Sequence, residues 1–276
     1  MQKRILTIQD LSCFGKCSLT VALPILSAMG IECTVIPTAV LSAHTGCFKD
    51  YTFRDLTGDM EGIAAHWKSN DIKLDGIYTG YLGSPEQAEI VCGVIDSFRP
   101  TYVFVDPAMA DNGKLYTGFD NRIVTEMRKL CGAADVIVPN LTEAAFLLGE
   151  EYTPEKYNMD KIRDMLVELT GLGAKTAAMT GVCYGDRQGV VSYCGGTGEF
   201  TEYFAENLPV KCPGTGDVFS SVMFGALMNG QSLHDSMKLA VEFTLACIRE
   251  TVGDASHWYG VRFEPCLPIL WKKKTR

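Results

Sequence analysis

Residues 213–227 read PGTGDVFSSVMFGAL, in which a proline and two glycines lead directly into a stretch whose apolar residues recur at helical spacing. Glycine lets the backbone turn tightly, and the unpaired N–H groups at the start of a helix, together with the helix dipole, form an anion site. We therefore expect a helix from Asp217 to Asn229, stopped by Gly230, whose N-terminus can bind a phosphate group.

Asp217 is the unusual residue of this stretch, because its carboxylate would repel a bound phosphate. Its presence beside a phosphate site therefore suggests a separate function. Accepting a proton from a hydroxyl nucleophile would be such a function. The alternative is that Asp217 caps the helix while Gly214 and Gly216 shape a turn. Other phosphate motifs are absent from the sequence, which contains neither G-x-x-x-x-G-K-S/T nor a complete G-x-G-x-x-G after a strand.

Outward from this stretch, short runs rich in β-branched residues alternate with helical patterns, as in a parallel sheet with helices on its faces. A small hairpin, Gly189–Tyr193 with Thr201–Phe204, is expected to interrupt the alternation. No composition shift marks a second domain, so the sequence predicts one α/β domain over 1–276 with a mostly parallel central sheet. The expected strands are Arg4–Ile8, Thr34–Val40, Gly76–Thr79, Tyr102–Asp106, Val136–Val138 and Thr176–Met179.

Helix boundaries are marked by capping residues. Ser84-Pro85-Glu86-Gln87 is typical of an N-cap, an N1 proline and a capping-box glutamine. Pro24 should kink the first helix of the chain or delay its start. The other helices are expected after Ser18, ending near Gly30, from about Asp160 to Leu169, and from Ser232, with Asp235 three residues later.

The carboxyl ends of the expected strands are polar or rich in glycine. In an open α/β sheet, ligands bind outside these ends, because loops and helix N-termini converge there. The sequence therefore predicts a binding site at this edge. The strand ends are Gln9-Asp10, Ser42–Gly46, Gly80–Ser84, Asp106-Pro107 and Pro139–Glu143.

Composition excludes several classes of function. The 276 residues are 47% apolar and 21% charged, which is ordinary globular usage. The net charge of −8 opposes a phosphate backbone, so nucleic acid is not an expected partner. The 11 cysteines form no C-x-x-C pair, and no stretch has the pattern of a signal peptide or a membrane span. We expect a soluble, cytoplasmic protein that does not contact membranes.

These motifs, in this order, resemble the pyridoxal (pyridoxine, pyridoxamine) kinases of the ribokinase-like superfamily. PGTGDVF at 213–219 is similar to the C-terminal signature of that superfamily. The resemblance covers nearly the whole chain and implies a ribokinase-like fold. It rests on Ile8-Gln9, Ser42–Gly46, Gly80–Ser84, Asp106–Met109, Pro139–Glu143 and the loop at Gly214.

The resemblance implies ATP-dependent phosphorylation of a hydroxymethyl group on a pyridine ring, giving pyridoxal phosphate or its relatives. Asp217 would be the base that takes the proton of this hydroxyl. The N–H groups of Gly214, Thr215 and Gly216 would form the anion hole for the transferred phosphoryl group.

On the nucleotide side, the resemblance assigns Asp106 and Glu143 to ATP and Mg²⁺, directly or through water. It also places Asn140 and Thr180 against ATP. From the residues alone, Asp106 could simply end a strand and Glu143 could be a first-turn helix carboxylate. Asn140 and Thr180 could equally make ordinary loop hydrogen bonds. A monovalent cation stays open as a further cofactor, and the resemblance implies a homodimer.

On the substrate side, the family places Asp10, His44, Thr45 and Tyr81 around the pyridine ring, with Tyr81 as an aromatic wall and His44 as a contact rather than the base. Asp10 stands where many pyridoxal kinases carry Ser, so a carboxylate would face the ring and could alter substrate preference. Cys212 allows the hypothesis of a reversible adduct with the aldehyde of pyridoxal; simple packing is the alternative.

Two other functions stay open. The nearest is hydroxymethylpyrimidine kinase of thiamin synthesis, with the same chemistry on a similar ring, alone or as a dual activity. The first loop of that family usually resembles Gly-Ser-Asp-x-Ser-Gly-Gly-Ala-Gly, whereas residues 9–17 read QDLSCFGKC. The other is a non-catalytic vitamer-binding protein, against which the intact GTGD at 214–217 argues, because a binder needs no base.

Overall fold

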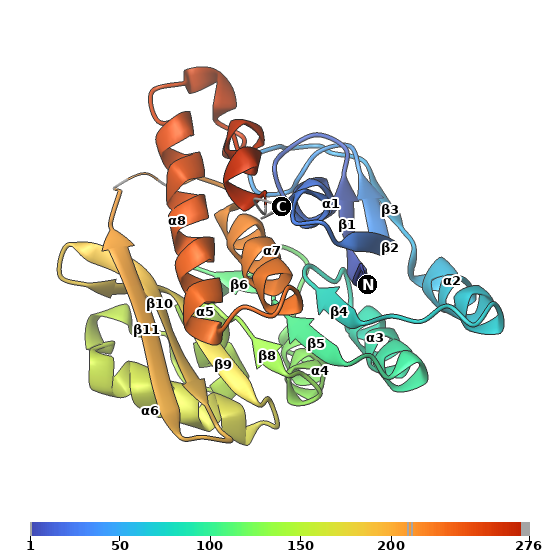
Figure 1. Ribbon diagram of the computed structural model, residues 1–276, viewed down its shortest axis with the longest axis horizontal. Helices are drawn as coiled ribbons and strands as arrows, with labels where there is room; N and C mark the ends of the chain where they lie inside the picture. The colour runs from blue at the N-terminus through green and yellow to red at the C-terminus, as the bar shows by residue number, and fades with distance from the viewer. Residues whose placement is uncertain (1, 209, 211, 272–276) are drawn as a thin grey trace, which may run out of the picture.

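The structure is a computed structural model that describes residues 2–208, 210 and 212–271. A nine-stranded sheet in the order β11-β10-β9-β8-β5-β4-β1-β2-β3 forms its centre, and β6 and β7 form a separate two-stranded ribbon (Figure 1). The strands are β1 (Arg4–Ser12), β2 (Glu32–Leu41), β3 (Phe53–Asp55), β4 (Gly76–Thr79), β5 (Tyr102–Val105), β6 (Ala110–Asp111), β7 (Lys114–Leu115), β8 (Val136–Ile137), β9 (Thr176–Tyr184), β10 (Arg187–Cys194) and β11 (Glu199–Glu206).

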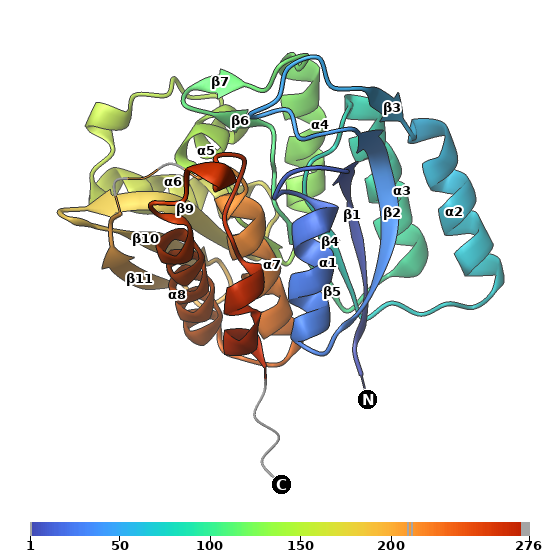
Figure 2. The ribbon, with the colours of Figure 1, turned by 90° about the horizontal axis from the view of Figure 1, so that it is seen from above.

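Helices cover both faces of the sheet, with α1, α7 and α8 on one face and α2 to α6 on the other (Figure 2). Each face buries its own apolar core against the sheet. No helix among the described residues is long and apolar enough to cross a membrane. The helices are α1 (Leu19–Ala28), α2 (Thr57–Ser69), α3 (Pro85–Phe98), α4 (Asn121–Gly132), α5 (Leu141–Leu148), α6 (Met159–Gly171), α7 (Thr215–Met228) and α8 (Leu233–Thr251), with 3-10 turns at Pro154–Lys156, Ala255–His257 and Glu264–Leu270.

The sheet confirms the predicted fold class. The central pairs, from β2 through β1, β4, β5 and β8 to β9, are all parallel. β10 pairs antiparallel with both β9 and β11, which confirms the predicted hairpin and extends it to Arg187–Cys194 and Glu199–Glu206. β3, β6 and β7 were not predicted, because strands of two or three residues carry no periodicity. One continuous sheet supports a single domain, which stays a prediction.

The first helix departs from expectation at Pro24. α1 runs from Leu19 to Ala28 with Pro24 inside it, so the prediction of a delayed start is wrong. One face of α1 is fully buried against the sheet, and this packing outweighs the hydrogen bond that proline removes.

The order of the strands reverses beside β1. The chain passes from β1 to β2 and β3 on one side, then to β4 and β5 on the other. In open α/β sheets, ligands usually bind at the carboxyl ends of the strands where the strand order reverses. Asp10 lies near the end of β1, and Tyr81 lies two residues after the end of β4.

Gln87 joins α3 to the sheet rather than completing the predicted capping box. Ser84 does cap α3, since its Oγ accepts the Gln87 N–H at 3.2 Å. The Gln87 side chain, however, accepts the N–H of Gly83 at 2.7 Å and donates to the Thr38 carbonyl at 2.9 Å and to Thr57 Oγ1 at 2.9 Å. A fully buried amide thus connects α3 to β2 and α2.

Replacing Gln87 by Ala should lower the free energy of unfolding by about 1–3 kcal/mol, because several buried polar groups lose their partner. Urea denaturation measures the change. Glu89→Ala, an exposed change on the same helix, should stay within about 0.5 kcal/mol of the unaltered protein. Equal stability of the two variants would contradict the role given to Gln87.

Candidate active site

Gly214 sets the position of the start of α7. It is the N-cap residue, with a φ of 78° in the left-handed region. A β-carbon at this position would overlap the carbonyl oxygen of Lys16, so only glycine allows α7 to approach the loop between β1 and α1 this closely. Glycine has no side chain to cap the first turn. The first N–H groups of the helix therefore lack a side-chain cap and could bind an anion, and binding of a phosphate by Gly214, Thr215 and Gly216 stays a prediction.

Asp217 lies in the first turn of α7, and the N-cap is Gly214, so the capping alternative for Asp217 is wrong. Burial and the nearby charges of Asp106 and Asp10 raise the pKa of Asp217 to about 8, while the backbone N–H of Ser18 favours the charged form. A carboxyl group that titrates near neutral pH is well matched to proton transfer as a general base.

Asp106 faces Asp217 from the end of β5. Its Oδ2 accepts a hydrogen bond of 2.7 Å from the hydroxyl of Ser220, which lies three residues beyond Asp217 on α7. Burial raises the pKa of Asp106 to about 6, and the bond from Ser220 opposes this shift. Ser220 was not recognised in the sequence, where it reads as one more residue of an apolar helix.

Glu143 is held rigidly at the start of α5. Its Oε2 accepts the N–H of Asn140 at 2.8 Å and its Oε1 that of Met109 at 3.2 Å. With Asn140 it forms a capping box, so the reading as a first-turn helix carboxylate is correct. Burial and the charge of Asp106 raise the pKa of Glu143. The two carboxyl groups therefore form a buried pair of like charge.

This pair suits a cation that brings ligands of its own. Among the described residues, no group of three or more His, Cys, Asp or Glu side chains could hold a metal ion. Mg²⁺ is commonly bound through one or two carboxylates, several waters and substrate phosphates. Asp106 and Glu143 fit that pattern, and a divalent cation would relieve the repulsion between them.

Asn140 and Thr180 lie side by side, joined by an isolated parallel bridge. Asn140 Oδ1 accepts the N–H groups of Thr142 and Glu143, and its Nδ2 donates to the Ala110 carbonyl at 2.9 Å. For Asn140, these are the ordinary loop hydrogen bonds that the sequence analysis gave as the alternative to a contact with ATP. Contact of Asn140 or Thr180 with ATP stays a prediction.

Asp10 lies on β1 where the register against β2 shifts, between Gln9 and Leu11. Such an irregularity re-aims side chains. Asp10 is buried and accepts a hydrogen bond of 2.8 Å from the hydroxyl of Ser12. Burial raises its pKa, whereas the hydroxyls of Ser18 and Ser12 favour the charged form.

His44 is a neutral histidine with both ring nitrogens engaged by backbone. Its Nδ1 accepts the N–H of Gly46 at 3.2 Å, so Nε2 carries the proton and faces the Tyr259 carbonyl at 3.0 Å. Burial lowers its pKa. His44 can therefore offer a substrate only the surface of its ring, in line with the expectation that it is not the base.

Tyr81 belongs to an aromatic group that the sequence revealed only in part. Its ring stacks on Phe119 at 5.6 Å and approaches Tyr116 at 6.4 Å. Both partners follow the short β6-β7 ribbon, whose sequence has no recognisable pattern. Burial, with the charge of Asp10, raises the pKa of Tyr81 to about 12, so its hydroxyl can donate a hydrogen bond. Thr45 is exposed on the neighbouring loop.

A second aromatic group surrounds His44 and was missed altogether. Phe14 lies 4.7 Å from Tyr259 and 5.6 Å from Phe48, and Phe48 lies 4.8 Å from Trp258. These residues come from three separate loops, so no local signal links them. The group brings the C-terminal part of the chain into contact with the loops that carry Phe14 and Phe48.

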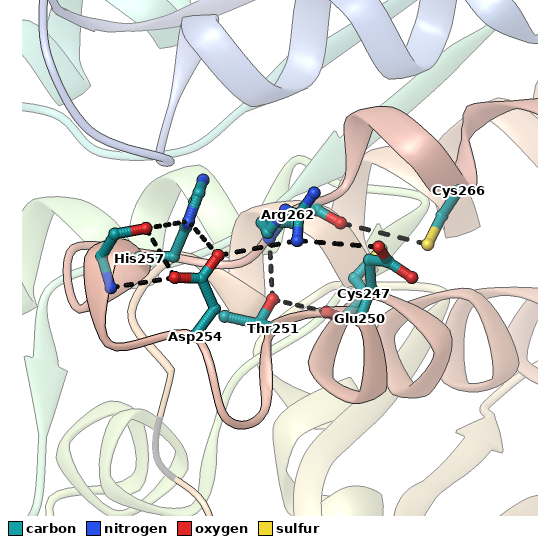
Figure 3. A network of polar contacts seen from close by, with 8 residues as sticks. Cys247, Glu250, Thr251, Asp254, His257, Arg262 and Cys266 are labelled. Atoms are coloured by element: carbon teal, nitrogen blue, oxygen red, sulfur yellow. Dashed lines mark hydrogen bonds and ion pairs between the residues drawn. The ribbon is translucent and has the colours of Figure 1, made fainter.

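The loop that carries Trp258 and Tyr259 is held by a polar network (Figure 3). Asp254 Oδ2 lies 2.9 Å from His257 Nδ1 and 3.6 Å from the guanidinium of Arg262. The backbone N–H of Arg262 donates to Thr251 Oγ1 at 2.8 Å. This network fixes the loop on the end of α8.

Asp217→Asn should stabilise the fold increasingly as pH rises. A folded-state pKa of about 8, above that of the unfolded chain, means that ionisation of Asp217 costs stability between about pH 4 and 8. The stability gain of the variant should therefore be larger at pH 8.5 than at pH 5, by more than about 1 kcal/mol. Urea unfolding at both pH values measures it. The same stability gain at both pH values would contradict the raised pKa of Asp217.

The chain is similar in sequence and in fold to known proteins. The phosphomethylpyrimidine kinase family model matches residues 5–260. A candidate phosphomethylpyrimidine kinase from Bacteroides thetaiotaomicron, crystallised with pyridoxal, is 40% identical, with 98% of this chain and 96% of that chain covered and a TM-score of 0.93.

A pyridoxal kinase from Lactobacillus plantarum is 30% identical over 98% of this chain and 97% of that chain, with a TM-score of 0.91. The hydroxymethylpyrimidine/phosphomethylpyrimidine kinase of Bacillus subtilis is 23% identical over 93% of this chain and 86% of its own length. These matches confirm the resemblance that the sequence motifs predicted. The chain therefore belongs to the phosphomethylpyrimidine kinase family, together with pyridoxal kinases of the ribokinase-like superfamily, and is a kinase.

Proposed function

We propose that this chain transfers the γ-phosphoryl group of ATP to the hydroxymethyl group of a vitamin B6 compound: pyridoxal, pyridoxine or pyridoxamine. The observation that carries the proposal is the position of Asp217, a carboxyl group with a pKa of about 8 in the first turn of a helix that has no side-chain cap on its first N–H groups. Base and phosphate site are thus built into the same turn.

In the proposed reaction, the pyridine ring lies beside Tyr81 and His44, with Thr45 at the rim and Asp10 facing a ring substituent. Asp10 is buried, so it can hydrogen-bond a protonated ring nitrogen or a hydroxyl group. This contact would be the specificity element of the substrate side. It also distinguishes the chain from family members that carry Ser at the same place.

Asp217 accepts the proton of the hydroxymethyl group as the hydroxymethyl oxygen attacks the γ-phosphorus of ATP. The bond between the γ-phosphorus and the oxygen that bridges it to the β-phosphate breaks, and ADP leaves. The N–H groups of Gly214, Thr215 and Gly216 stabilise the charge that develops on the transferred phosphoryl group. Phosphoryl transfer requires positioning and charge neutralisation more than covalent help from the protein, and this turn supplies both.

Asp106 and Glu143 would hold Mg²⁺ on the nucleotide side, directly or through water, and the ion would neutralise phosphate charge there. Asn140 and Thr180 would contact the nucleotide. The homodimer, the cytoplasmic location and a monovalent cation stay predictions. The aldehyde adduct at Cys212 also stays a hypothesis; burial raises the pKa of this thiol, which disfavours the reactive thiolate.

A second candidate is hydroxymethylpyrimidine kinase, alone or as a dual activity. The family description and the Bacillus subtilis relative favour it. The Bacteroides relative crystallised with pyridoxal is more similar to this chain and favours the B6 reading. Both substrates present a hydroxymethyl group on an aromatic nitrogen ring, so the proposed residues would perform the same step.

An ADP-release assay at fixed Mg-ATP should show turnover with pyridoxal, pyridoxine or pyridoxamine that exceeds turnover with hydroxymethylpyrimidine. Asp217→Asn should lower kcat by at least about 100-fold, because general base catalysis is lost. Binding of the vitamer, measured by calorimetry, should change by only a few-fold. Preference for hydroxymethylpyrimidine would replace the primary proposal with the second candidate, and absence of turnover with every substrate would favour the non-catalytic binder.

Asp106→Asn should raise the KM for Mg-ATP by about tenfold, because one charge facing the cation is lost while the shape of the side chain is kept. The KM for the vitamer should change by less than about twofold. Steady-state kinetics with each substrate varied in turn measure both constants. Asp111→Asn, an exposed change five residues further on, serves as the control. If Asp106→Asn changed only the KM for the vitamer, Asp106 would contact the vitamer rather than the nucleotide, and the proposed role would be wrong.

A further inference from the structure

Ser18, at the start of α1, has a backbone conformation that residues with a side chain rarely adopt. Its φ is 49° and its ψ is −131°. The described part of the chain contains five non-glycine residues with positive φ, and Ser18 is the only one of the five that is buried. Glycine adopts this conformation freely, whereas a side chain there costs stability. The serine side chain therefore calls for an explanation.

Ser18 does not act as an ordinary serine cap. A serine at the N-cap usually has an extended backbone, and its hydroxyl oxygen accepts an N–H group of the first helical turn. Ser18 is the N-cap residue of α1 but makes no such side-chain bond. Its backbone carbonyl alone accepts the N–H groups of Val21 and Ala22, at 3.0 and 2.9 Å. The start of α1 thus does not depend on the hydroxyl group of Ser18.

The two donors of Ser18 serve two different carboxylates. Its hydroxyl group hydrogen-bonds the side chain of Asp10, and its backbone N–H hydrogen-bonds that of Asp217. Burial raises the pKa of both carboxyl groups, and these two bonds oppose that shift. The neighbouring residue, Cys17, shows the same arrangement, because burial and the charges of Asp217 and Asp10 raise the pKa of its thiol. Carboxylates from β1 and α7 therefore meet at Ser18.

The loop before Ser18 is held close to α7. A β-carbon on Gly214 would overlap the carbonyl oxygen of Lys16, two residues before Ser18, so the loop and the start of α7 are in close contact. Asp217 lies three residues after Gly214, in the first turn of α7. This contact brings Asp217 to the N–H group of Ser18.

We propose that Ser18 is a positioning residue that joins Asp10 to Asp217 and so sets the distance between the ring-binding carboxylate and the base. The proposal rests on the proposed kinase function, in which Asp10 faces a substituent of the ring and Asp217 faces the hydroxymethyl group of the same ring. A fixed distance between the two carboxylates aligns this group with the base. The hydroxyl of Ser18 has one proton to donate, so the backbone N–H is needed for the second carboxylate.

Kinetics of Ser18→Ala and Ser18→Gly test this role, because both variants lack the hydroxyl group and keep the backbone N–H. Each should lower kcat by about three- to tenfold, less than the hundredfold that a full 1 Å misplacement can cause. The KM for the vitamer should rise by about threefold, and the KM for Mg-ATP should stay within about twofold. Rates are normalised to the concentration of ATP-binding sites. Ser27→Ala, an exposed change on α1, should retain all three constants.

The comparison of glycine with alanine separates positioning from folding. Glycine relieves the strained backbone and alanine does not, so Ser18→Gly should unfold at a higher urea concentration than Ser18→Ala. Activity should not follow stability, and both variants should be equally slow. Unaltered kinetics of Ser18→Gly would overturn the proposal, because the backbone conformation alone would then be sufficient.

Ser12→Ala is the matched variant for the contact with Asp10. The hydroxyl group of Ser12 donates to Asp10 Oδ2 at 2.8 Å from within β1. Its loss should raise the KM for the vitamer by about threefold and leave kcat within about twofold, whereas Ser18→Ala lowers kcat. Equal effects of Ser12→Ala and Ser18→Ala on both constants would overturn the link to Asp217.

A double variant tests whether Ser18 acts through Asp10. In the Asp10→Ala protein, the hydroxyl group of Ser18 has lost this carboxylate, so adding Ser18→Ala should cause no further loss of kcat. The full three- to tenfold loss in the Asp10→Ala protein would overturn the proposal.

The proposed function and the link between the carboxylates fail separately. If the unaltered protein phosphorylates none of the vitamers, the function fails, and a crystal structure decides the link. We expect Ser18 Oγ within about 2.5–3.0 Å of a carboxylate oxygen of Asp10, and the Ser18 nitrogen within about 2.7–3.2 Å of one of Asp217. Either separation beyond hydrogen-bond distance would overturn the link.

Discussion

The close approach of Gly214 to the carbonyl oxygen of Lys16 is the contact on which the site depends. It brings the start of α7 against the loop between β1 and α1, and only a glycine in a left-handed conformation permits it. The same loop is anchored from its other side, where the Lys16 ammonium pairs with Glu264 and lies 5.0 Å above the ring of Phe263. The N-terminal loop is thus held between α7 and the C-terminal segment.

Carboxyl groups that meet at one edge of the sheet account for the electrostatics of the site. Asp10, Asp106 and Asp217 come from parts of the chain that are far apart, and the charges of Asp10 and Asp106 both act on Asp217. Asp10 and Asp106 are buried, and Asp217 is half-buried. Burial raises the pKa of all three, and the charges of Asp106 and Asp10 add to the shift of Asp217. These shifts cost stability and give Asp217 a pKa suited to a base near neutral pH. The fold accommodates the cost with hydroxyl and backbone donors such as Ser12, Ser18 and Ser220.

Features that depend on local sequence could be predicted, and those that depend on distant contacts could not. The parallel strands, the serine cap of α3 and the glycine-led start of α7 carry their signals in a few consecutive residues. The hydrogen bond between His44 and the Tyr259 carbonyl joins residues 215 positions apart, and no sequence pattern predicts it. Gln87 shows that even a local motif can mislead. Its spacing from Ser84 predicts a capping box, but its buried side chain bonds instead to groups such as the Thr38 carbonyl.

The bond between His44 and Tyr259 has a consequence for the order in which the protein is made. The ribosome delivers the chain from its N-terminus, so the loops of β1, β2 and β4 emerge long before the segment that carries Trp258 and Tyr259. During synthesis, the aromatic group around His44 must stay open until almost the entire chain is available. The site is thus completed last, by residues that enter the structure after every strand of the sheet has been translated.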